Sequence, residues 1–65
     1  MENRFRSNLQ QLRKEGKMTQ RQLASALHIS VKTISHWETG YTEPSVTQIL
    51  DLAQFFNISL EELLT

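Results

Sequence analysis

The chain has 65 residues, with seven Lys or Arg, seven Asp or Glu and no cysteine, so its formal net charge is zero. This length allows one domain at most, residues 1–65, and the missing cysteines exclude disulfides and thiolate metal sites. No apolar run approaches the roughly 20 residues of a membrane span, and the first residues lack the apolar segment of a secretory signal. We therefore expect a cytoplasmic protein with no membrane partner.

The charges are separated along the chain, although their sum is zero. All seven basic residues lie in the first half, and the last of them is Lys32, whereas five of the seven acidic residues follow Trp37. Such an asymmetry is more informative than the sum, and it predicts a molecule with one basic end. An ordinary solvated surface would explain the charges equally well.

An apolar repeat of 3.6 residues runs through the chain, interrupted by only two glycines and one proline. This pattern predicts an all-α fold of five helices. The first helix is expected at about residues 3–15, with Phe5, Leu9 and Leu12 on one face. Gly16 then ends it.

The second helix is expected to begin at Thr19, where the sequence TQRQ has the form of a capping box. In a capping box the Thr19 hydroxyl accepts a hydrogen bond from a backbone N–H three residues on, and Gln22 reaches back to the cap. The apolar face of this helix consists of Leu23, Ala24 and Leu27.

Only His28 and Ile29 separate this helix from the third, which is expected at residues 30–39 with Gly40 at its end. A break this short forces a sharp crossing, and His tolerates the positive φ that the crossing needs. Residues 19–39 therefore have the form of a helix-turn-helix unit. Such a unit presents its second helix to the DNA major groove.

The fourth helix is expected after Pro44, where SVTQ forms a second capping box, and Asn57 ends it because Asn tolerates the left-handed conformation. Its core-facing residues are expected at helical spacing: Val46, Ile49, Leu50, Ala53 and Phe56. A third box, SLEE, opens a fifth helix with Leu60, Leu63 and Leu64 on its apolar face.

The third helix has two distinct faces when its residues are placed about 100° apart. Val31, Ile34 and Trp37 lie within about 60° of the inward direction. The polar residues that face outward or lie on the flanks are Lys32, Thr33, Ser35, His36 and Thr39. Lysine can donate to guanine and hydroxyls can donate or accept, so this face is suited to base edges. The N-terminus of the second helix, at Thr19 and Gln20, is suited to a phosphate.

Three stretches, MTQRQLASALHIS, KTISHWETG and EPSVTQILDLAQFFNISLEELL, resemble the phage repressor and Cro type of helix-turn-helix domain, the xenobiotic-response-element family. The resemblance covers residues 4–64. It implies a compact five-helix domain that binds operator DNA, usually as a dimer, and regulates transcription.

The resemblance also implies roles for individual residues. Gln20 would hold a phosphate. The residues implied to face base edges are Val31, Lys32, Thr33 and His36. Those implied to contact the DNA backbone are Ser30, Thr39, Tyr41 and Thr42. The chain departs from the family at His28, where glycine is most frequent, and at Val31, where some members have a polar base reader.

A charged pair is expected beneath the reading helix. Glu38 falls about 40° from the inward direction of the third helix, and Arg13 lies on the inner edge of the first. The resemblance implies that these two side chains pair. The pair either fixes the orientation of the third helix or is simply an ion pair of the fold.

An exposed aromatic residue is expected on the fourth helix. Phe55 lies about opposite the expected core-facing residues, so it should be partly exposed. Because it stands beside the corner formed by Asn57 and Ile58, we regard these three residues as candidate contacts of a weak homodimer.

Catalytic and metal-binding patterns are missing from the sequence. No nucleophile is accompanied by a base and an orienting acid, and no Gly-rich phosphate loop is present, so we expect neither an enzyme nor a cofactor. His28 and His36 are eight residues apart without a cysteine, which disfavours a metal site.

Our leading prediction is a sequence-specific DNA-binding transcriptional regulator, a repressor, that binds a palindromic site in double-stranded DNA as a dimer. The alternative is an antitoxin-like or regulatory module that binds another protein. The zero net charge and the expected exposure of Phe55 favour this alternative.

Overall fold

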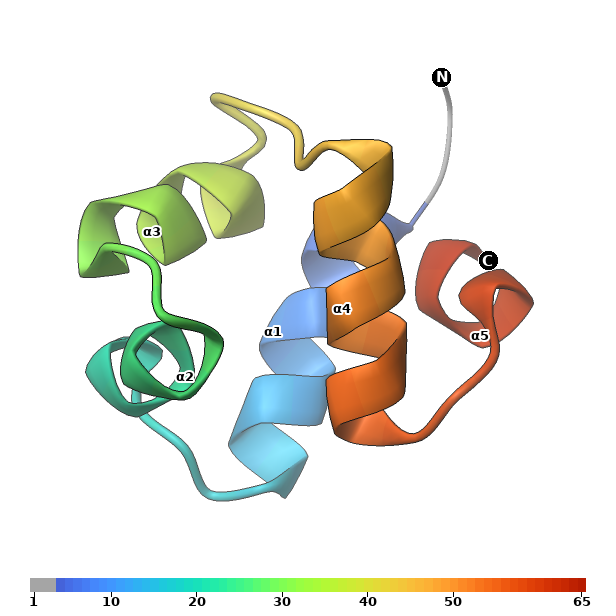
Figure 1. Ribbon diagram of the computed structural model, residues 1–65, viewed down its shortest axis with the longest axis horizontal. Coiled ribbons are helices and arrows are strands. Elements are labelled where there is room, and N and C mark those ends of the chain that lie inside the picture. Colours follow the sequence, from blue (N-terminus) through green and yellow to red (C-terminus); the bar gives the residue numbers. More distant parts are fainter. Residues whose placement is uncertain (1–3) are drawn as a thin grey trace.

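The computed structural model describes residues 4–65. It contains five helices: α1 (Phe5–Glu15), α2 (Gln20–Leu27), α3 (Val31–Thr39), α4 (Val46–Phe56) and α5 (Leu60–Leu64) (Figure 1). No strand occurs among residues 4–65, so the predicted all-α class is confirmed. The expected start of the first helix at Asn3 lies outside the described residues.

The helices begin where the local cap signals predict. Thr19, Ser45 and Ser59 each accept a hydrogen bond from the backbone three residues on, and the side chains at those third positions return the bond to the cap. All three predicted capping boxes are therefore present. Ser30 caps α3 without the returned bond.

The ends of three helices depend on residues with positive φ. His28 follows α2 with a φ of 58°, Gly40 follows α3 with 81° and Asn57 follows α4 with 55°. After α1 the positive φ falls on Lys17, at 56°, whereas Gly16 has an ordinary φ of −79°. The turn after α1 therefore does not use the conformational freedom of its glycine.

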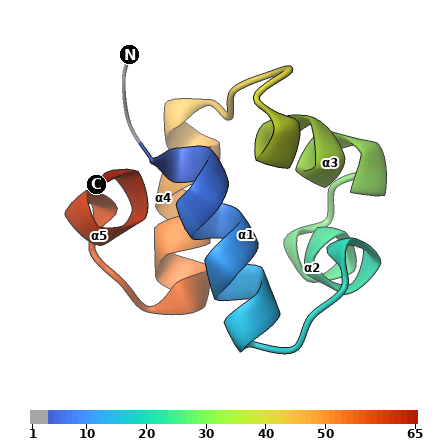
Figure 2. The ribbon, with the colours of Figure 1, turned by 180° about the vertical axis from the view of Figure 1, so that it is seen from behind.

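The core lies between all five helices. Figures 1 and 2 show α2 and α3 on one side of α1 and α4, with α5 on the other side. The buried apolar residues come from every helix: Phe5, Leu9, Leu23, Ala24, Ile34, Trp37, Leu52, Ala53 and Leu63. The ring of Phe5 meets that of Trp37 edge to face, with centroids 6.3 Å apart, and so joins α1 to α3.

The predicted core-facing side of α4 is wrong at two positions. Val46 is 76% exposed and Leu50 is also exposed, whereas Leu52, which the prediction left out, is fully buried. Apolar residues occur on almost every side of this helix, so its periodicity fits two rotations. Packing against the other helices decides between them, and it turns Leu52 and Ala53 inward.

Two further expectations about apolar residues are corrected. Leu60, the first residue of the short α5, is exposed, and so is Val31, the first residue of α3. A helix that packs along one side buries its middle residues better than its first residue.

Phe55 is 42% exposed. This partial exposure agrees with the expectation. Phe55 is nevertheless only about 60° around α4 from the buried Leu52, so it borders the buried side and does not lie opposite it.

Candidate nucleic-acid interface

The turn between α2 and α3 is closed by backbone hydrogen bonds. The N–H of His28 donates to the carbonyl oxygen of Ser25 at 3.2 Å, and the N–H of Ile29 donates to that of Ala24 at 3.0 Å. Ser30 then accepts from the N–H of Thr33 at 3.1 Å. His28 adopts the left-handed conformation that glycine most often supplies, and only three residues separate the end of α2 from the start of α3. The predicted helix-turn-helix geometry is thus formed.

Helix α3 has a buried face and a polar face. Ile34 is fully buried and Trp37 is almost so, whereas Lys32 and Thr39 are exposed and Thr33 is half-buried. Figure 1 shows α3 at the edge of the molecule. Of the residues expected to face base edges, Val31 and Lys32 are therefore exposed, whereas Thr33 and His36 are half-buried.

His36 does not project freely into solvent. Its ring is half-buried and lies against the exposed ring of Tyr41, with centroids 4.7 Å apart and planes inclined by 59°. The backbone imposes this contact, because the N–H groups of Tyr41 and Thr42 both donate to the carbonyl oxygen of His36, at 2.9 and 3.4 Å. The structure therefore joins a predicted base-facing residue to a predicted backbone-facing one.

The hydroxyl groups of the site already take part in local hydrogen bonds. Those of Ser30 and Thr33 lie 2.8 Å apart, and that of Thr39 donates to the carbonyl oxygen of His36 at 3.2 Å. Thr19 accepts from the N–H of Gln22 at 3.0 Å. The oxygen atoms of these four hydroxyl groups are therefore held in place by contacts within the protein.

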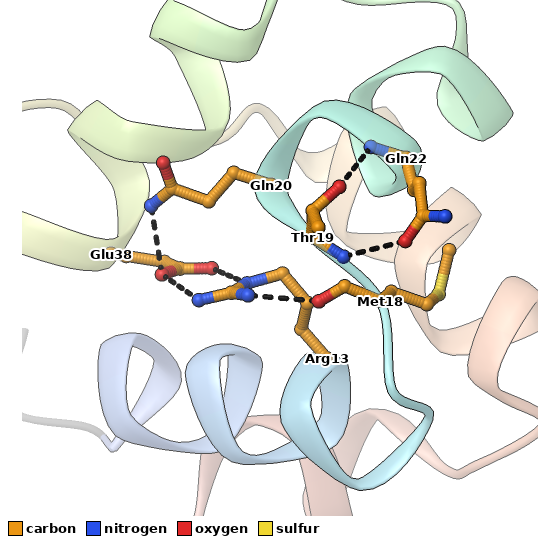
Figure 3. Close-up of polar contacts among 6 residues, drawn as sticks. All are labelled: Arg13, Met18, Thr19, Gln20, Gln22 and Glu38. Carbon is orange, nitrogen blue, oxygen red and sulfur yellow. Dashed lines mark hydrogen bonds and ion pairs between the residues drawn. The ribbon is translucent and has the colours of Figure 1, made fainter.

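A hydrogen-bonded ion pair lies beneath α3 (Figure 3). Arg13 donates from Nε to Glu38 Oε2 at 2.7 Å and from Nη2 to Oε1 at 3.0 Å, and its Nη1 donates to the carbonyl oxygen of Met18 at 2.9 Å. The side chains of Arg13 and Glu38 are only 11% and 2% exposed. This bidentate pair connects α1 and the α1–α2 segment to the last turn of α3.

Gln20 completes this cluster, although the sequence interpretation assigned it to a phosphate. Its Nε2 donates to Glu38 Oε1 at 3.1 Å, so the carboxylate accepts three hydrogen bonds (Figure 3). Gln20 is half-buried, and one of its two amide hydrogens is used by this bond. Sequence periodicity carries no signal for this contact, because the two residues are 18 positions apart in different helices.

The cluster shifts the pKa values of both ions. Burial raises the pKa of Glu38, but hydrogen bonds from Arg13 and Gln20 and the positive charge of Arg13 outweigh it, and the net pKa is lower than usual. The pKa of Arg13 is raised by its hydrogen bond to Glu38, against the opposing effect of burial. Both groups are therefore charged at neutral pH.

A second arginine, which the sequence interpretation did not single out, contacts the end of α3. Nη1 of Arg6, in the first turn of α1, donates to the carbonyl oxygen of Thr39 at 3.3 Å. Arg6 is exposed, unlike Arg13. The two partners are 33 positions apart in the sequence, which explains why no local pattern predicts the contact.

The three candidate dimer residues lie at the corner between α4 and α5, away from α3 (Figure 1). The ring of Phe55 packs edge to face on that of Phe56, with centroids 5.1 Å apart. Asn57 supplies the turn after α4, and Ile58 packs against the core. Phe55 is thus the largest apolar surface that this corner presents.

Within residues 4–65, no three His, Cys, Asp or Glu side chains are grouped so that they could hold a metal ion. No helix in this part of the chain is long and apolar enough to cross a membrane.

Comparison with known proteins relates this chain to a family. A family model described as helix-turn-helix matches residues 9–63. The "HTH-type transcriptional activator BcrR" of Enterococcus faecalis is 39% identical over 61 residues, which cover 94% of this chain and 30% of that protein. The "uncharacterized HTH-type transcriptional regulator YqaE" of Bacillus subtilis (strain 168) is 32% identical over 60 residues, covering 92% of this chain and 52% of that protein.

A solved structure shares the fold. The crystal structure of a transcriptional regulator from Listeria innocua matches with a TM-score of 0.91 and 30% identity, over 98% of this chain and 60% of that one. The chain therefore spans less than two thirds of the length of each of these three relatives.

Proposed function

The chain belongs to the helix-turn-helix family, and from that premise we propose that it binds double-stranded DNA and thereby regulates transcription. The observation that carries the proposal is the division of α3 into a buried apolar face and an open polar face. Reading helices of this motif lie in the major groove, where each base pair shows a distinct pattern of donors and acceptors. Regulation of this kind requires binding alone, with no catalytic step.

In this proposal the first turns of α3 contact base edges. Lys32 is exposed and makes none of the side-chain hydrogen bonds found in residues 4–65, so its amine is available to donate to guanine O6 and N7. The exposed methyl groups of Val31 suit the methyl group of thymine. Thr33 and His36 flank Lys32, and the contact between His36 and Tyr41 restricts the imidazole to one side of the groove.

Backbone phosphates would be held at both ends of the polar face. At one end, Thr19, Gln20 and Ser30 stand at the N-termini of α2 and α3, where helix dipoles and N–H groups favour an anion. At the other end, Thr39, Tyr41 and Thr42 are exposed beside the C-terminus of α3. Such contacts fix the register of the protein on DNA, whereas base contacts supply specificity.

We further propose that two copies bind a palindromic site through a weak contact at the corner of Phe55, Asn57 and Ile58. The exposed ring of Phe55 supports this assignment. The half-sites would then lie one helical turn, about 34–36 Å, apart. The expected repression remains a prediction, since one relative is named an activator. A promoter–reporter assay with and without the protein would decide the direction of control.

The alternative function, binding of another protein, has one supporting observation. Val46, Leu50, Phe55 and Leu60 are all exposed large apolar residues in the C-terminal half. They belong to α4 and α5, not to α3, so a protein contact there would leave the polar face of α3 free for DNA.

A salt titration tests the proposed function directly. We expect binding-site selection from random duplexes to yield a preferred sequence. If about 4–6 phosphates are neutralised per protomer, log K should fall by roughly 0.9 per contact for each log unit of salt. A slope near zero at the selected sequence would refute DNA binding and would leave the protein-binding alternative.

A further inference from the structure

We propose that Arg6 is a further DNA-contacting residue, which holds a backbone phosphate at the C-terminal end of α3. The proposal rests on the proposed function, because it assumes that α3 lies in the major groove. The proposal gives a DNA contact to α1, a helix that otherwise only packs against α3.

The position of Arg6 is defined by two contacts. Its Nη1 donates to the carbonyl oxygen of Thr39 at 3.3 Å, and its side chain lies over Gly40. A Cβ atom at residue 40 would come within 2.5 Å of Nη1 and 2.7 Å of Cδ of Arg6. In its present position the Arg6 side chain therefore occupies space that a Cβ atom at residue 40 would need.

The residues that follow α3 in the sequence supply no strong positive charge to this end of the helix. No Lys or Arg follows Lys32, and the segment after α3 contains Tyr41, Thr42 and the acidic Glu43. A phosphate near Tyr41 and Thr42 would find only neutral donors there, next to a carboxylate. Arg6 brings a positive charge to this end from a distant part of the chain.

The guanidinium retains the donors that a phosphate needs. An arginine has five N–H donors, and the bond to Thr39 uses one of them. Because Arg6 is exposed, the others are open to solvent and can form the planar, two-bond contact that arginine makes with phosphate. Arg13 is unsuited to this role, since three of its five donors are bound to Glu38 and Met18 and its side chain is only 11% exposed.

The bond to Thr39 also prepares Arg6 for this role. A cation beside the last carbonyl groups of α3 interacts favourably with the helix dipole, which keeps the guanidinium at this end in the absence of DNA. A phosphate bound to Arg6 would therefore be placed at a fixed distance from α3. The contact would add to affinity and would leave base preference to the residues on α3.

Salt titrations of four proteins test this assignment, with fluorescence anisotropy of a labelled duplex obtained by binding-site selection. The proteins are the wild type, Arg6→Gln, Arg6→Lys and the control Arg4→Gln, which removes the same charge two residues earlier in the chain. We expect Arg6→Gln to lower affinity about tenfold or more, the value for one lost hydrogen bond to a charged group. Its salt slope should be smaller by roughly 0.9 per bound protomer. Arg6→Lys should retain most of the slope, and Arg4→Gln should change neither quantity by as much.

The possible outcomes separate this proposal from the proposed function. A wild-type slope near zero would refute DNA binding altogether. A steep wild-type slope that Arg6→Gln leaves unchanged, or that Arg4→Gln reduces equally, would overturn the role of Arg6 alone. A changed base preference with an unchanged slope would show that Arg6 only positions α3, and would also overturn it.

A second measurement localises the contact on the DNA. Duplexes that carry one neutral methylphosphonate at successive positions should include a position that weakens the wild type but not Arg6→Gln. If Arg6→Gln is unfolded at the assay temperature, Arg6→Lys takes its place in this comparison. The loss of affinity that the methylphosphonate causes at that position should then be smaller for Arg6→Lys than for the wild type. Equal penalties at every position would refute the contact.

Discussion

Replacement of Glu38 by alanine should remove most of the stability of this domain. The carboxylate is 2% exposed and accepts hydrogen bonds from Arg13 Nε, Arg13 Nη2 and Gln20 Nε2 at 2.7, 3.0 and 3.1 Å. Without it, the guanidinium of Arg13 would keep its charge in a site that is only 11% exposed. The amide of Gln20 would also lose its acceptor.

The expected cost is comparable with the whole stability. Removing one partner of a buried ion pair costs about 3–5 kcal/mol, because the remaining charge is buried without compensation. The core of a domain of this size seldom supplies more than about 3–5 kcal/mol. We therefore expect Glu38→Ala to be largely unfolded at 25 °C. Glu38→Gln keeps the shape and one acceptor oxygen, so it should lose less.

Urea denaturation followed by far-UV circular dichroism would measure these changes. Glu43→Ala is the matched control, since Glu43 is an exposed carboxylate in the loop after α3. Its free energy of unfolding should stay within about 0.5 kcal/mol of the wild type, as is usual for surface substitutions. Similar unfolding curves for Glu38→Ala and Glu43→Ala would show that the Glu38 carboxylate is solvated, and would refute this account of the cluster.

Three further predictions concern Glu38, Lys32 and Phe55. The pKa of Glu38 is lower in the folded than in the unfolded chain, so its contribution to stability is complete above the unfolded value of about 4.3 and is lost as the pH falls through the folded value. Urea denaturation between pH 7 and pH 2 should therefore show that the free energy of unfolding falls less in Glu38→Gln than in the wild type. Equal falls would contradict the direction of this pKa shift. Lys32→Ala should relax the preference for one base pair and should lose about 1–3 kcal/mol of binding free energy at that position. Equal weakening of binding to all selected sequences would contradict the assignment. Phe55→Lys should lower cooperativity on a full palindromic site but not half-site affinity, whereas the control Val46→Lys, which changes another exposed residue of α4, should leave the full-site isotherm unchanged.

The features that sequence reasoning predicted well depend on neighbouring residues. A capping box uses two side chains three residues apart, so Thr19 and Gln22 reveal it without knowledge of the fold. The turn at His28 is equally local, because its position follows from the spacing of two apolar patterns. Ile34 and Trp37 were assigned to the core correctly because α3 is apolar on one side only.

The features that were missed depend on packing between distant segments. Helix α4 is apolar on most of its sides, so its own sequence could not decide whether Leu50 or Leu52 faces the core. The contact of Arg6 with Thr39 joins residues 33 positions apart. The pairing of the His36 and Tyr41 rings requires the chain to fold back after Gly40, which periodicity does not describe.

Gln20 lies at the start of α2, as the sequence predicts, but its contact with Glu38 is not predicted. Its place at the start of α2 suggested a phosphate contact, yet the structure shows its amide bonded to Glu38 beneath α3. Because an amide nitrogen carries two hydrogens, one hydrogen can serve Glu38 while the other faces the DNA. A phosphate bound there would be connected through Gln20 and Glu38 to Arg13, and so to α1. The ion pair would then do more than support the fold, because it would hold the phosphate contact of α2 in a fixed relation to the reading face of α3.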